Sequence, residues 1–226
     1  TSLISVAANN VTIAGLTLDG DNANINSGKT SNGADIDADY GIRVQDCYNN
    51  LVVNNNYILN VNEAGIEIMK TAPACGPVQT GIQIKTNRIF NSPGLMGGQG
   101  FGVEVRMNAS ALIDDNCIDA CDVGVRFAAN AQGTVTSNVF GALTKNLKDV
   151  LVTANSGIVN CDGQNDFSGT TFGVQNESTT EVDAENNYWG DGVGGPSGVG
   201  AGTGAPVSAN VDFCPWLDAA PPTGMP

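Results

Sequence analysis

A short phrase recurs along this chain of 226 residues: an apolar residue, two variable residues, asparagine, one variable residue and another apolar residue. Between its copies lies a second phrase, in which glycine precedes an apolar, a variable and an apolar residue. Successive asparagines are 22 to 31 residues apart, which indicates one structural unit repeated with insertions at its corners. The asparagine anchors are Asn56, Asn87, Asn116, Asn138, Asn187 and a degraded copy at Asn165, and the glycine anchors are Gly41, Gly65, Gly102, Gly124 and Gly173.

Within each unit the apolar residues step by two, which is the period of a β-strand, and no stretch sustains the spacing of an amphipathic helix. Units of this length predict an all-β chain, a right-handed parallel β-helix of about seven coils. We assign residues 1–190 to this solenoid and residues 191–226 to a Gly/Pro-rich cap and tail. Each coil turns one apolar row inward, and stacking of the coils buries it.

The two recurring residue types have separate predicted roles. We expect each repeated asparagine to adopt a left-handed backbone conformation at a tight corner, and its amide to hydrogen-bond to the asparagine one coil away. Repeated glycine is expected to supply a positive φ angle at another corner.

These phrases resemble the repeats of the pectin-lyase-like right-handed β-helix superfamily over roughly residues 3–190. The segments Asn186-Asn187-Tyr188-Trp189-Gly190 and Val211-Asp212-Phe213-Cys214-Pro215-Trp216-Leu217 are similar to the closing coil of large bacterial and archaeal surface proteins with this fold. The fold hosts polysaccharide lyases, glycosidases, phage tailspikes, adhesins and structural surface proteins, so it does not decide the function.

Composition excludes several classes of function. The chain has no histidine, which excludes imidazole zinc sites and Ser-His-Asp chemistry. Its net charge of −14 would repel nucleic acid, and it argues against a polyuronate substrate unless a local basic groove or calcium intervenes. No apolar run is long enough to span a membrane.

Six cysteines, an even number, predict disulfides and an extracellular location. Coil positions suggest the pairs Cys47 with Cys75, Cys117 with Cys121 and Cys161 with Cys214, the alternative being free thiols buried in the core. Candidate glycosylation sites, which chance also produces in a chain this rich in Asn, Ser and Thr, are Asn10, Asn108 and Asn176.

The outward residue of the glycine phrase forms a charged row: Arg43, Glu67, Glu104 and Arg126, with Lys70 and Arg106 nearby. This row could be a lyase site, in which an arginine or lysine removes a proton beside a carboxylate neutralised by calcium. The interpretation that we favour is a ladder of opposite charges between coils, worth a fraction of a kcal/mol per exposed pair.

A calcium site is a further expectation. Asp35, Asp37 and Asp39 alternate in a long insertion, and carboxylate oxygens favour Ca²⁺. The match to a known calcium loop is imperfect, and a solvated acidic loop is the simpler interpretation.

The ends of the solenoid suggest a function. Nothing precedes Leu3 that could cover the open strand edges of the first coil, and such edges recruit other strands. The sequence therefore predicts an extracellular structural or adhesive protein, without catalysis of its own, that associates head to tail into a homo-polymer. The alternative is a secreted polysaccharide lyase or glycan-binding module that uses the face with Arg43, Glu67, Glu104 and Arg126.

Overall fold

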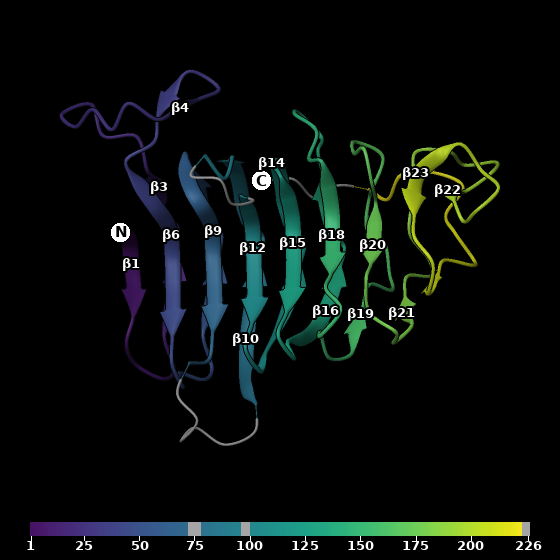
Figure 1. Ribbon diagram of the computed structural model, residues 1–226, viewed down its shortest axis with the longest axis horizontal. Coiled ribbons are helices and arrows are strands. Elements are labelled where there is room, and N and C mark those ends of the chain that lie inside the picture. The colour runs from purple at the N-terminus through teal and green to yellow at the C-terminus, as the bar shows by residue number, and fades with distance from the viewer. Residues whose placement is uncertain (72–77, 96–99, 223–226) are drawn as a thin grey trace.

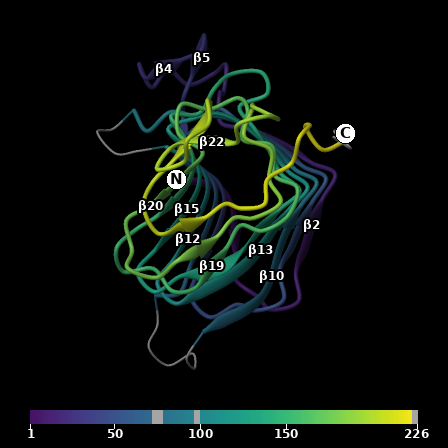
Figure 2. The same cartoon turned by 90° about the vertical axis from the view of Figure 1, so that its right-hand side faces the viewer.

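The computed structural model describes residues 1–71, 78–95 and 100–222, and it shows a parallel β-helix (Figure 1). Three sheets wrap around one core, and every strand pair within them is parallel. No helix occurs in these residues, which confirms the predicted all-β class. Figure 2, a view along the solenoid, shows the coils stacked behind one another.

The three sheets differ in length. The nine-stranded sheet runs, in spatial order, through β1 (Ser2–Val6), β6 (Ala38–Gln45), β9 (Val61–Met69), β12 (Phe101–Arg106), β15 (Val123–Ala128), β18 (Lys148–Val152), β20 (Val174–Asn176), β23 (Gly204–Val207) and β22 (Pro196–Gly198). The eight-stranded sheet runs through β2 (Thr12–Ala14), β7 (Val52–Asn54), β10 (Gln79–Lys85), β13 (Ala109–Asp114), β16 (Gln132–Thr136), β19 (Val159–Asn160), β21 (Val182–Asp183) and β24 (Val211–Asp212). The five-stranded sheet runs through β3 (Thr17–Asp19), β8 (Tyr57–Leu59), β11 (Arg88–Ser92), β14 (Cys117–Cys121) and β17 (Val139–Phe140).

Two features depart from regular coils. Strands β4 (Thr30–Ser31) and β5 (Ala34–Asp35) form an antiparallel hairpin in the first long insertion, which rises away from the sheets in Figure 1. Past residue 190, β23 and β24 continue two of the sheets as an eighth coil.

The core is a continuous column of inward side chains, as the strand period predicts. Towards the C-terminal end the column becomes aromatic, where the rings of Phe140, Phe167 and Trp189 stack with centroids 5.4 and 4.7 Å apart. Phe213 and Trp216, both partly buried, pack against the end of the same column. Trp189 is thus fully buried as part of the stack, and Phe213 and Trp216 of the last coil cover the end of the core.

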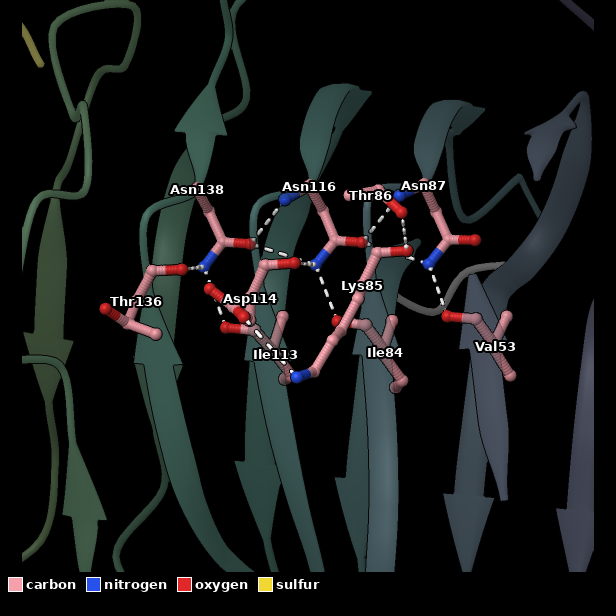
Figure 3. Close-up of polar contacts among 10 residues, drawn as sticks. All are labelled: Val53, Ile84, Lys85, Thr86, Asn87, Ile113, Asp114, Asn116, Thr136 and Asn138. Carbon is pink, nitrogen blue, oxygen red and sulfur yellow. Dashed lines mark hydrogen bonds and ion pairs between the residues drawn. The ribbon is translucent and has the colours of Figure 1, made fainter. Parts of the chain in front are cut away.

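The repeated asparagines form a hydrogen-bonded ladder at the corner between the eight- and five-stranded sheets (Figure 3). The Nδ2 of Asn87 donates to the Oδ1 of Asn116 at 3.0 Å, and the same link joins Asn116 to Asn138 at 3.0 Å. Each amide nitrogen also donates to a strand carbonyl of the preceding coil. The complete ladder is Asn56, Asn87, Asn116, Asn138, Asn165 and Asn187.

The predicted backbone role of these asparagines is wrong. The left-handed conformation belongs to the residue before each ladder position, with φ between 51° and 62° at Asn55, Thr86, Asp115, Ser137, Gln164 and Asn186. Asparagine is required at the ladder position because its side chain both donates and accepts there.

The predicted role of the repeated glycines is also wrong. The φ angles at Gly41, Gly65, Gly102 and Gly124 are not positive. A Cβ at Gly65 would instead stand 2.7 Å from the carbonyl oxygen of Gly102 and 2.6 Å from a methyl of Ile89. Glycine is therefore needed because neighbouring coils and the five-stranded sheet approach the backbone too closely for a side chain.

Candidate functional site

The charged row lies on the outer face of the nine-stranded sheet, where strand register brings its members together. Glu67 of β9 pairs in register with Arg43 of β6 and Glu104 of β12, and Glu104 pairs with Arg126 of β15. A small apolar cluster lies beside the row on the same sheet, formed by Tyr40, Ala64, Phe101, Val123 and Leu151, the last of which pairs in register with Arg126.

Arginines hold both carboxylates of the row. Arg43 Nε contacts one oxygen of Glu67, and Arg106 Nη2 donates to the other at 2.6 Å. Glu104 accepts from Arg126 Nη1 at 2.6 Å and lies 3.6 Å from Arg106 Nε. The result is a continuous alternating chain of five charges across four coils, in which Arg106 links the two glutamates.

Burial sets the electrostatics of this chain. The Glu67 side chain is fully buried and that of Glu104 is 5% exposed, whereas the three arginine side chains are 23 to 28% exposed. Burial raises the pKa of Glu104, and the positive charges of Arg106 and Arg126 oppose that shift. Arg43 and Arg126 also lie over the rings of Tyr40 and Phe101, at 4.1 and 5.0 Å. The arginines therefore form the accessible surface of the row, and the glutamates lie beneath them.

The predicted calcium ligands do not converge. Asp35 accepts from the Ser27 hydroxyl and backbone N–H, Asp37 accepts from the Asn22 N–H, and Asp39 accepts from Asn62 and the amino group of residue 1. Asp35 and Asp37 thus hold different parts of the insertion, whereas Asp39 binds residue 1 and Asn62 outside it. In the ranges that the structure describes, no three Asp, Glu, Cys or His side chains are grouped to hold a metal ion.

Two of the three predicted cysteine pairs are wrong. Cys117 and Cys121 are free thiols four residues apart on strand β14, where an extended backbone holds them too far apart to be bridged. Cys161 is fully buried and Cys214 is exposed, and both are free. Cys47 is disulfide-bonded, and its predicted partner Cys75 lies outside the described residues.

The three candidate glycosylation sites differ in access. Asn10 is exposed, and Asn108 is partly buried. Asn176 is 7% exposed, and its amide nitrogen donates to the carbonyls of Thr180 and Asn210. The Oδ1 of Asn10 accepts from the Asn50 amide at 2.9 Å, so among the three it is Asn176 whose amide nitrogen, the atom that a glycan would join, is already engaged.

A second amide ladder, which the repeated phrases did not predict, lies at the other end of the strands of the five-stranded sheet. Asn91 donates to the Oδ1 of Asn60 at 2.7 Å, and Asn60 donates to Asp19 at 2.8 Å. Ser31 and Asn32 of the hairpin donate to the Oδ1 of Asn91, both at 2.9 Å, which fixes the hairpin to the solenoid. The sequence does contain a sign of this second ladder, because Asn60 and Asn91 each lie four residues after a position of the first ladder.

The comparison with protein families gives one decisive match. The model described as a right-handed β-helix region matches residues 14–189. The chain belongs to this family of right-handed β-helix proteins.

Other comparisons add little about function. The comparison with curated proteins finds no match. Among solved structures, one titled "The complex structure of XylC with xylose" is similar, with 18% sequence identity and a TM-score of 0.40 over 63% of this chain. The match covers 20% of that protein's chain, so the β-helix chain spans about one fifth of it. The described part of the β-helix chain contains no helix that could cross a membrane.

Proposed function

We propose that this β-helix chain is an extracellular structural module that joins end to end with a second copy of itself. The main support for the proposal comes from the unpaired strand edges of the first coil. Within the described residues, its strands β1, β2 and β3 are the terminal strands of the three sheets, and their outer edges, which lie on the same rim, pair with no other strand there. Open edges present unpaired N–H and C=O groups, which pair readily with another chain.

Side-chain exposure at the two ends supports the same proposal. On the rim, Leu16 occupies the ladder position of the first coil, where its N–H donates to the Oδ1 of Asn56, and it is 42% exposed. Inward residues Ile4 and Leu18 of that coil are only partly buried. At the opposite end, Val193 and Val199 in the loops around β22 are 94% and 58% exposed. Apolar groups at both ends suit a heterologous contact that repeats without closing.

Charge sets the conditions for such assembly. All nine Lys and Arg residues precede residue 149, and residues 149–226 contain ten Asp and Glu. The C-terminal coils are therefore uniformly acidic, and the first forty residues also carry more acidic than basic groups. Repulsion between such ends is screened over about 8 Å at physiological ionic strength, so assembly should increase with salt.

The extracellular location rests on one residue. A disulfide at Cys47 supports an oxidising environment, in which such bonds persist.

Sedimentation velocity over a concentration series, at low and at physiological salt, tests the proposal. We expect species larger than a monomer that grow with concentration and salt. Leu16→Asp should abolish them, and Ile158→Asp is the matched control because Ile158 is 70% exposed but lies on the side of the solenoid, near β19. A monomer at every concentration, or equal effects of the two substitutions, would refute end-to-end association.

Glycan binding on the nine-stranded face is the second candidate. It is favoured by the row of three partly exposed arginines on a strongly acidic protein. Lyase chemistry gains less support, because both carboxylates of the row are occupied by arginine. Incubation of the protein with uronate polymers distinguishes the two activities. A rise in ultraviolet absorbance that the Glu104→Ala substitution removes would establish a lyase, whereas binding without such a rise would establish a glycan-binding module.

A further inference from the structure

A separate pocket lies on the outside of the corner between the eight- and five-stranded sheets, away from the charged row. It has a volume of 360 Å³ and spans the first three coils. Its lining includes Leu16, Thr17, Asn55, Tyr57, Thr86 and Arg88, from the corners of these three coils. This size and this mixture of apolar and polar groups are typical of a site for a small organic molecule.

Arg88 distinguishes this pocket from the rest of the surface. The other three arginines are ion-paired, whereas Arg88 forms no ion pair with any residue that the structure describes. Its Nε is buried without a hydrogen-bond partner, as are those of Arg106 and Arg126, and its guanidinium lies 5.3 Å from the centre of the Tyr57 ring. The missing ion pair therefore sets Arg88 apart, and an unpaired guanidinium in a protein of net charge −14 attracts an anion.

The backbone at the edge of the pocket is also unusual. Thr86 has a φ of 51°, and it is the one β-branched residue among those that precede a ladder asparagine. Its hydroxyl is held by the carbonyl of Lys85 at 2.7 Å. A β-branched residue in the left-handed region is strained, and strain of this kind collects at ligand sites.

We infer that this pocket binds a single acidic sugar unit, with Arg88 holding the carboxylate. A guanidinium fork matches a carboxylate with two parallel hydrogen bonds. The side-chain amide of Asn55, which forms no hydrogen bond with a described residue, and the Tyr57 hydroxyl can then meet ring hydroxyls, while Leu16 faces the apolar side of the ring. A long polyanion is disfavoured, because the acidic coils after residue 148 would repel its continuation along the solenoid.

Ligand-observed NMR with sodium glucuronate tests this inference, with neutral glucuronamide as the matched probe. Glucuronate should bind and the amide should bind at least about tenfold more weakly, because a charged hydrogen-bond pair is lost. Arg88→Gln should cause a similar loss for glucuronate, and Arg88→Lys should restore only part of it.

The control variant is Lys85→Gln, which removes a neighbouring positive charge that is paired with Asp114 at 3.7 Å and lies outside the pocket. It should leave glucuronate binding unchanged. Thermal unfolding of each variant shows that the fold is retained. Equal binding of glucuronate and its amide, unchanged binding by Arg88→Gln, or no binding at the solubility limit of the sugar would overturn the inference.

Discussion

Removal of one ladder amide, by Asn116→Ala, tests the physical account of this fold most directly. The Asn116 side chain is buried, and two buried backbone groups depend on it. Its Oδ1 accepts from the Asn87 N–H at 2.9 Å, and its Nδ2 donates to the Ile84 carbonyl at 2.9 Å. A buried group left without a partner costs about 1–3 kcal/mol, so we expect the free energy of unfolding to fall by roughly 2–6 kcal/mol.

Urea denaturation followed by circular dichroism measures this change. The slope of unfolding free energy against urea also reports whether the coils still unfold together, because contacts in a solenoid are mainly between neighbouring coils. Asn155→Ala is the control, since Asn155 is exposed and its substitution should change stability by no more than about 0.5 kcal/mol. A cost below about 1 kcal/mol for Asn116→Ala would show that water replaces the ladder and would refute the reasoning.

Three further predictions concern other parts of the core. Gly65→Ala should lower the melting temperature markedly, because the added methyl would stand 2.7 Å from the Gly102 carbonyl oxygen; a variant as stable as the parent would mean that the coils can separate freely. Burial raises the pKa of Asp149 well above its ordinary value of 3.8, so the contribution of Asp149 to stability should be fully present below that value and be lost as pH rises through the folded-state pKa. Asp149→Asn should flatten this part of the stability–pH curve, and an unchanged curve would contradict the assignment. Of the four free thiols that the structure describes, Cys214 alone should react rapidly with a thiol reagent in the native protein, because Cys117, Cys121 and Cys161 are buried and burial raises their pKa to about 12; rapid labelling of any of these three, located by mass spectrometry, would contradict this.

Ladder contacts were predictable because stacked coils bring equivalent residues of the repeat together. For the same reason, the position of Glu67 between Arg43 and Glu104 was predictable from the repeat. It could not reveal that Arg106 bridges the two glutamates, because that contact is diagonal and depends on how long side chains bend towards each other. The pocket around Arg88 was not predicted either, since its wall combines corner residues of three coils that no single motif marks.

Sequence alone determined the architecture of this protein, because a strand period of two and a repeating unit leave stacked coils as the way to bury the apolar row. Tertiary structure alone decided why glycine recurs, which thiols stay free and where each aspartate of the first insertion finds its partner. Periodic residues have equivalent neighbours in every coil, so their contacts follow from the pattern. Insertions and coil ends have no such equivalents, and their contacts depend on the distances that the folded chain sets.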